Sequence, residues 1–269
     1  MVRDLTKLPP RVERIGYGMR ITEADLPVIE ALGGRLTFIP LDVADFASIE
    51  IAAPVVRDLY VDAGLATDLR VLESFTRLER LHVQAAKSKF SVDLTRLPHL
   101  RSYAGRFRNF ESVLSVGTLR SFETTRMPWE LVEEFEAPLE ELELWHARPI
   151  TEVPQLKSSS ALRWLRMNGC AELDLSGLRT YRRTLRTLGL SDIGKVTSAE
   201  SLLELNLESL GIGDCRNIEP IDPLVTLDFP EIGIAGSNVF DTAFRSQVRH
   251  PEKWSFPPRK GRRPSSGPF

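Results

Sequence analysis

Cysteine and histidine are the residue types in this sequence best suited to metal binding or nucleophilic catalysis. The chain contains Cys170, Cys215, His82, His99, His146 and His250. It has no Cys-x-x-Cys pair, and no group of histidines, cysteines and carboxylates has the spacing of a metal site or a catalytic triad. We therefore expect no catalytic residue, no metal and no cofactor.

One segment comes close to a phosphate-binding loop. The run from Gly189 to Val196, GLSDIGKV, fits the GxxxxGK pattern but has valine where the loop needs Ser or Thr to hold Mg²⁺. It also lies where a predicted strand turns outward, so no helix N-terminus follows to hold phosphate. We predict no nucleotide site here.

A larger set of side chains is suited to the recognition of another macromolecule. Trp, Tyr and Arg are enriched at binding hot spots because they combine a large rigid surface with a polar group. Such residues, with histidines and glutamates among them, recur from residue 60 to residue 166. The predicted partner-binding residues are Tyr60, Arg80, His82, Arg101, Arg106, Phe107, Arg120, Glu123, Arg126, Glu141, Glu143, Trp145, His146, Arg163, Trp164 and Arg166.

The spacing of these residues follows an internal repeat with apolar residues at its positions 1, 4 and 6. Clear copies are Leu78/Leu81/Val83, Leu139/Leu142/Leu144, Leu162/Leu165/Met167, Leu185/Leu188/Leu190 and Leu207/Leu210/Ile212. Weaker copies begin at residues 56, 100, 119 and 224, and two less certain ones at residues 12 and 36. The spacing is about 20 residues, which is close to the period of leucine-rich repeats.

Each copy is predicted to form one short strand, because positions 4 and 6 alternate with polar neighbours. Positions 2, 3 and 5 then point away from the core into a concave groove, and positions 7 and 8 lie on its rim. The predicted partner-binding residues occupy these positions. A register shifted by one residue would instead turn Trp145 and Trp164 into the core. A single repeat cannot bury its own apolar edge, so neighbouring repeats must stack and align their strands into a parallel sheet.

The domain prediction is one repeat domain over residues 1–254, followed by a disordered Pro/Gly/basic tail over residues 255–269. Residues 1–35 form an N-terminal cap and first coil, residues 36–232 the repeats, and residues 233–254 a C-terminal cap. Thr22 and Asp25 predict a helix over Glu23 to Leu32 that Gly33 and Gly34 end. A second helix is expected from Asn238 to about Arg249, with Phe240, Phe244 and Val248 facing the last repeat.

The strand pattern resembles the leucine-rich-repeat family over roughly residues 12–231, best in LRWLRMNGC (Leu162 to Cys170) and LESLGIGDC (Leu207 to Cys215). The resemblance implies an α/β fold: a right-handed solenoid shaped as a horseshoe or arc. A curved parallel sheet would line its concave face, with short helices, 3-10 turns and loops on the convex face. It also implies that both cysteines point inward and bond the turn backbone, and that the protein binds other proteins. Position 9 departs from the family pattern in most other copies.

Composition places limits on the partner and the compartment. The formal net charge of -2 gives no global field toward nucleic acid. No run of about 18 apolar residues could span a membrane, so we expect a cytoplasmic protein. The predicted function is a non-catalytic protein-protein interaction scaffold, not an enzyme, that binds a partner protein on the concave face.

Three alternatives remain open. By analogy with short, irregular repeats, the protein is a bacterial immunity or effector-type protein that neutralises or regulates a specific protein. In another, the groove is used for a ligand or for enzymatic chemistry, with His82, His146 and the glutamates as acid/base groups. In the third, Arg57, Arg80, Arg101 and Arg120, or the basic run from Arg259 to Arg263, bind nucleic acid.

Overall fold

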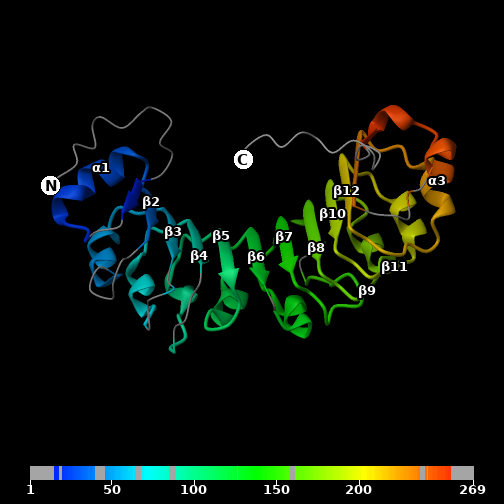
Figure 1. Cartoon of the computed structure of the whole chain (residues 1–269). Helices are drawn as coiled ribbons and strands as arrows, with labels where there is room; N and C mark the ends of the chain where they lie inside the picture. The colour runs from blue at the N-terminus through cyan, green and yellow to red at the C-terminus, as the bar shows by residue number, and fades with distance from the viewer. Residues whose placement is uncertain are drawn as a thin grey trace. The chain divides into compact units, whose positions relative to one another are not determined.

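Parallel strands that follow one another along the chain form the framework of the protein (Figure 1). The computed structural model describes residues 15–17, 20–39, 46–62, 64, 68–84, 89–125, 127–157, 161–236, 240 and 242–255. The chain divides into two compact units. Unit 1 comprises Met1–Trp145 and Leu156–Ala161, and unit 2 comprises His146–Gln155 and Leu162–Phe269.

Unit 1 contains one parallel sheet whose strands pair in chain order. The strands are β1 (Ile15–Tyr17), β2 (Arg35–Phe38), β3 (Asp58–Asp62), β4 (Arg80–Gln84), β5 (Ser102–Arg106), β6 (Ser121–Thr125) and β7 (Glu141–Trp145). The helical connections between them are η2 (Glu23–Asp25), α1 (Leu26–Ala31), η3 (Ser48–Ala52), η4 (Arg70–Ser74), η5 (Leu94–Arg96), η6 (Glu111–Ser115) and η7 (Trp129–Glu134).

Unit 2 contains a second run of parallel strands and a smaller ladder beside it. The main strands are β8 (Trp164–Asn168), β10 (Thr187–Ser191), β12 (Ser209–Gly213), β13 (Glu231–Ala235) and β14 (Trp254–Ser255), while β9 (Glu172–Asp174) pairs with β11 (Lys195–Thr197). The helical segments are η9 (Ser176–Tyr181), η10 (Ala199–Glu204), η11 (Asp222–Thr226), α3 (Thr242–Gln247) and η12 (Pro251–Lys253). Both units are thus α/β, and consecutive parallel strands with short connections are consistent with a solenoid.

The strand register confirms which side chains are buried. In β4, Leu81 and Val83 are buried while His82 between them is half-buried, and β8 repeats this with Leu165 and Met167. The connecting segments bury apolar residues as well, among them Leu72, Val113 and Leu178. Most repeats therefore contribute two inward strand side chains and part of their connection to the core, as the repeat pattern predicted, whereas β5 contributes only Tyr103.

A backbone ladder joins successive repeats just before each strand. The carbonyl oxygen of Arg57 accepts hydrogen bonds from the N–H groups of Glu79 (2.8 Å) and Arg80 (2.9 Å). The same double acceptance recurs at the carbonyls of Gly34, Glu79, Arg101 and Arg120 in unit 1 and of Arg163 and Arg186 in unit 2. These bonds place the position-2 residue of each of these repeats directly beside the position-2 residue of the next repeat.

Two weak copies of the repeat were placed wrongly in the sequence. Leu36 pairs with Leu59, so it occupies position 4, and Ile39, which was expected at that inward position, is 48% exposed. Leu224 lies in η11 and not at the start of a strand. The copy that follows the one at Leu207 contains Ile232 and Ile234, because β13 pairs with β12 through Glu231 and Ser209, and this restores the regular spacing.

The predicted terminal helices are shorter than expected. The Thr22 N–H donates to the Asp25 carboxylate at 2.8 Å, but the first turn is the 3-10 segment η2 and only α1 is α-helical. In unit 2, Phe240, Phe244 and Val248 are buried as predicted, and Phe244 packs against Trp254 with ring centroids 5.6 Å apart. Asn238 and the predicted tail beyond Ser255 lie outside the described residues.

The Gly33-Gly34 turn allows a matched test of the connection between α1 and β2. Both residues have a φ of +73°, but a Cβ on Gly33 would meet nothing within 4 Å, whereas one on Gly34 would lie 2.5 Å from the Val55 carbonyl oxygen. We expect Gly33→Ala to cost about 1–2 kcal/mol for the left-handed conformation alone. Gly34→Ala should cost about 1–3 kcal/mol more because the backbone must move.

The measurement is urea unfolding of the full chain for both variants beside the wild type. An equal loss of stability in the two variants would show that the close approach of Val55 to Gly34 does not matter.

Candidate functional site

The outward side chains of β3 to β7 form rows across the open face of the unit 1 sheet. One row contains Tyr60, His82, Ala104, Glu123 and Glu143, and the row at the start of the strands contains Asp58, Arg80, Ser102, Ser121 and Glu141. Neighbouring members of a row are about 4.8 Å apart along the sheet. Residues from five strands are therefore presented together on one surface.

Tyr60 and His82 form the aromatic part of this face. Their rings stack with centroids 4.6 Å apart and an interplanar angle of 29°. Both side chains are half-buried, and the Tyr60 hydroxyl donates a hydrogen bond to the Gln84 side-chain oxygen. Stacking and this bond hold a flat aromatic surface in one conformation, which lowers the entropy lost when a partner covers it.

Ion pairs order the charged side chains around the aromatic pair. Arg80 lies 3.1 Å from the Asp58 carboxylate, whose side chain is only 10% exposed. Arg57 pairs with Glu79 at 3.4 Å and Arg120 with Glu140 at 3.7 Å, but these residues are more exposed. Exposed pairs of this kind add about 1 kcal/mol or less to stability, so their main effect is to fix where each charge lies.

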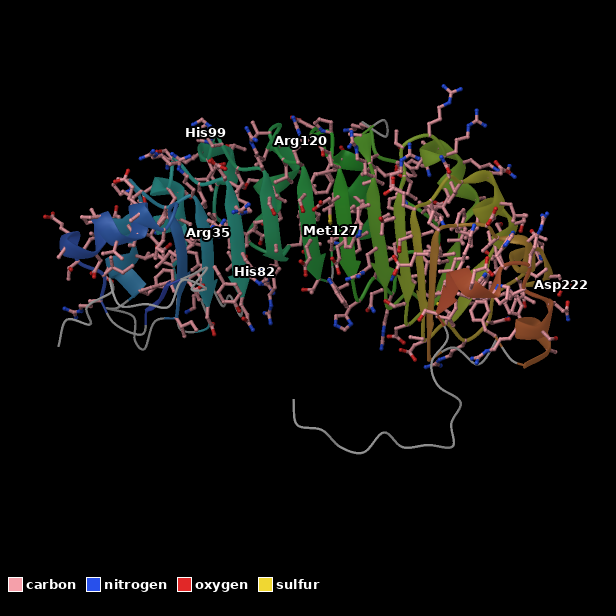
Figure 2. The ribbon with its side chains drawn as sticks, turned by 90° about the horizontal axis from the view of Figure 1, so that it is seen from above. Arg35, His82, His99, Arg120, Met127 and Asp222 are labelled. Atoms are coloured by element: carbon pink, nitrogen blue, oxygen red, sulfur yellow. The ribbon has the colours of Figure 1, made fainter. Side chains whose placement is uncertain are left out.

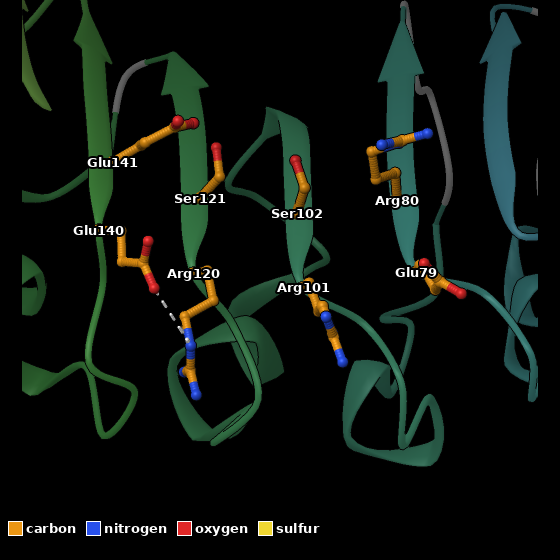
Figure 3. Close-up of a pocket in the computed structure, with 8 residues that line it drawn as sticks. All are labelled: Glu79, Arg80, Arg101, Ser102, Arg120, Ser121, Glu140 and Glu141. Atoms are coloured by element: carbon orange, nitrogen blue, oxygen red, sulfur yellow. Dashed lines mark ion pairs between the residues drawn. The ribbon is translucent and has the colours of Figure 1, made fainter. Parts of the chain in front are cut away.

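A hollow of about 250 Å³ lies at the start of β4 to β7 (Figure 3). Its lining residues are Glu79, Arg80, Arg101, Ser102, Arg120, Ser121, Glu140 and Glu141. The hollow exists because β5 and β6 carry the short side chains of Ser102 and Ser121, while the strands on either side carry Arg80 and Glu141. Charged side chains of both signs therefore surround two small hydroxyl residues.

Unit 2 presents a different open face. Trp164 is half-buried on β8, and the Arg166 guanidinium lies 5.0 Å from the centroid of its ring, which is a cation–π contact. Gly189, Gly211 and Gly233 follow in one row on the next three strands. Leu165 and Met167 are buried, so the predicted register holds and Trp164 is not a core residue. Arg163 is exposed before β8.

Trp145 and His146 lie at the point where unit 1 ends and unit 2 begins. Trp145 is half-buried, and its ring N–H is buried without a hydrogen-bond acceptor among the described residues. His146 is exposed and has a φ of +55°.

Two predicted site residues are not on the accessible surface. Phe107 is 4% exposed, because a turn closed by the Phe110 N–H to the Phe107 carbonyl at 2.9 Å follows β5 directly and places Phe107 in the core. Glu143 is on the predicted face but only 9% exposed, and the bulky Trp145 follows two residues later on the same face. The prediction of an accessible side chain is wrong for both.

The remaining predicted residues differ in exposure. Arg106 is exposed at the end of β5, Glu123 is half-buried on β6, and Arg126 lies outside the described residues. Ser102 and Ser121 were not predicted as site residues, because large side chains are the ones expected at a binding surface. Two successive strands with a small residue at position 3, flanked by strands with a long one, were the signal for the hollow.

The cysteines are buried free thiols in unit 2. Burial raises the pKa of Cys170 from the ordinary 9.0 to about 12, with a further contribution from Cys215. Burial also raises the pKa of Cys215, to about 11. The Cys215 thiol donates weakly to the Gly213 carbonyl oxygen at 3.5 Å and to the Leu190 carbonyl oxygen at 3.9 Å. Its side chain is buried, as the resemblance implied, but both acceptors belong to strands and not to a turn.

No cluster of three or more His, Cys, Asp or Glu side chains within the described ranges could hold a metal ion. Among those same residues, every helix is too short or too polar to cross a bilayer. No known protein family matches the chain, and a search of the curated proteins finds no similar sequence.

The raised thiol pKa values predict that both cysteines react slowly with thiol-specific reagents. Because the thiolate is the reactive form, a disulfide reagent at pH 8 should label the folded chain far more slowly than the chain in urea. Since the pKa is raised on folding, the stabilising contribution of the protonated thiols is complete below pH 9 and is lost as the pH rises toward 11 to 12.

The labelling rate with and without urea is the measurement, with Cys170→Ala and Cys215→Ala assigning each thiol. Rapid labelling of both thiols in the folded chain would contradict their burial.

Proposed function

We propose that this chain is a leucine-rich-repeat solenoid that acts as a non-catalytic scaffold and binds a partner protein on the open face of its sheet. The repeat assignment is supported by the buried residues at positions 4 and 6 and by the inward Cys215 thiol. The binding role is supported above all by the stacked pair of Tyr60 and His82 on the open face.

An aromatic pair at this position is suited to protein binding for a physical reason. Both rings lie on a strand side that contributes nothing to the core of unit 1, because Leu59 and Val61, and Leu81 and Val83, occupy the inward positions. Half-buried rigid rings gain apolar burial on binding and lose little entropy. The charged rows around them supply the polar rim that such interfaces have.

The open face favours a macromolecular partner over a small substrate. The hollow of about 250 Å³ is below the range of about 300–1,000 Å³ typical of small-ligand pockets. The rows of side chains, in contrast, extend across five strands, which matches the many dispersed contacts of a protein interface.

The test compares two histidines of unit 1. His82→Ala and Tyr60→Ala should each cost about 2 kcal/mol or more in binding free energy, because they remove half of the rigid pair. His99→Ala is the matched control, since His99 is exposed before β5 and lies away from His82 (Figure 2). Affinity capture from cells that express the protein identifies the partner, and titration with the purified partner gives the affinities.

The expected result is unchanged binding by His99→Ala and a loss of binding by both other variants, with wild-type unfolding curves throughout. A partner that binds all three variants as tightly as the wild type would overturn the proposed use of this face.

Trp164 provides a separate test in unit 2. Because it is half-buried and outside the core, Trp164→Ala should leave the unfolding transition in place and cost a partner about 2 kcal/mol or more. Circular dichroism and titration with the captured partner are the measurements. Wild-type affinity for Trp164→Ala would remove unit 2 from the proposed surface.

A further inference from the structure

We propose that the hollow of unit 1 binds a partner segment that carries one acidic and one basic side chain, the acidic one at Arg101 and the basic one at Glu141. This inference rests on the proposed function and adds the chemistry of the partner. It follows from the order of charges along the start of the strands and from the two small residues between them.

The position-2 side chains of unit 1 form a row with an odd number of charges. In order they are Arg57, Glu79, Arg101, Arg120 and Glu140, and the backbone ladder fixes each beside the next. Glu79 pairs with Arg57 and Glu140 pairs with Arg120. Both carboxylates of the row are thus engaged with other arginines, and Arg101 is left between two completed pairs.

Arg101 is exposed and makes no ion pair or side-chain hydrogen bond with any residue that the structure describes. Figure 3 shows its side chain leaving the start of β5 without a dashed contact, whereas Arg120 beside it is joined to Glu140. A guanidinium can accept a carboxylate with two parallel hydrogen bonds. An acidic side chain of a partner is the group that supplies the missing pair.

Glu141 is the corresponding unpaired anion. It is exposed on β7, lines the hollow, and has no ion-pair partner within the described part of the chain. Its carboxylate extends toward β6 in Figure 3. It would repel a second carboxylate, so a purely acidic ligand is disfavoured at this end and a lysine or arginine of the partner is favoured.

The two charges are placed for one short segment. Their strands, β5 and β7, are separated by one strand, so the backbones that carry the two residues are about 10 Å apart across the sheet. Ser102 and Ser121 between them leave room for a backbone to cross. An extended peptide advances about 3.3 Å per residue, so an acidic and a basic residue three positions apart span this distance. Their side chains point to opposite sides of the peptide, and Arg101 and Glu141 lie at opposite ends of the hollow in Figure 3.

The probe is the tetrapeptide acetyl-Glu-Ser-Ser-Lys-amide together with its reversed sequence, titrated into the full chain and followed by NMR. Matched peptides carry Gln in place of Glu or in place of Lys. The protein variants are Arg101→Gln, Arg101→Lys and Glu141→Gln, with Arg108→Gln as the control. Arg108 is also an exposed arginine of unit 1 without an ion-pair partner among the described residues, but it does not line the hollow.

One of the two peptide orders is expected to bind, and replacing its Glu should weaken binding about tenfold. Arg101→Gln should weaken the parent peptide by the same factor and have no effect on the peptide that lacks Glu. Arg101→Lys should retain part of the affinity, because lysine keeps the positive charge but cannot make two parallel hydrogen bonds to the carboxylate. Glu141→Gln should weaken binding of the parent peptide and have no effect on the peptide that lacks Lys. Arg108→Gln should bind the parent peptide like the wild type.

The inference would be overturned if the protein and peptide changes had independent effects on affinity. Equal chemical-shift changes at all exposed arginines, or no saturable binding at millimolar peptide, would also overturn it. The outcome is separable from that of the proposed function. If His82→Ala loses the partner but the effects of the protein and peptide changes are independent, only the charge assignment is refuted. If the protein and peptide changes depend on each other but no partner requires His82, only the proposed scaffold role is refuted.

Discussion

The double hydrogen bond at the position-2 carbonyl is the interaction on which the rest of the structure depends. One oxygen, such as that of Arg57, receives two N–H groups of the next repeat, so it sets both the distance between repeats and the residue at which each strand begins. Each bond contributes only about 0.5–1.5 kcal/mol net, but the bond recurs along each unit. Because the ladder fixes the backbone, a change of side chain at an exposed position-2 residue such as Arg101 alters the surface and not the fold.

Much of the fold could be predicted from the sequence, because burial in this protein is periodic. Leu81, Val83, Leu165 and Met167 are inward for the same reason, namely that strand side chains alternate between faces. The errors came where the apolar pattern is ambiguous. Ile39 and Leu224 fit the template by type, but pairing with the neighbouring strand, which no local pattern contains, assigns their repeats differently. The same pattern also continues through residue 145 and does not predict the division into two units.

The candidate surface was less accessible to prediction. Large side chains such as Tyr60 and His82 could be assigned to the open face from their position in the repeat, but their stacking depends on rotamers. Phe107 was misassigned because a short repeat turns inward immediately after β5. The hollow was not predicted because it arises from the small side chains of Ser102 and Ser121. Small side chains create a hollow only where the neighbouring strands carry long ones, and the strand neighbours are known only from the structure.

The row of glycines in unit 2 has a consequence for how such a protein could change. A Cβ on Gly211 or Gly233 would approach no atom other than a carbonyl oxygen at 4.0 Å, whereas one on Gly189 would meet Arg166 at 3.2 Å. New side chains can therefore be added on β12 and β13 at little cost to the backbone. Substitutions in this part of the sheet, made by selection or in a designed library, could therefore create a new binding specificity without disrupting the repeats.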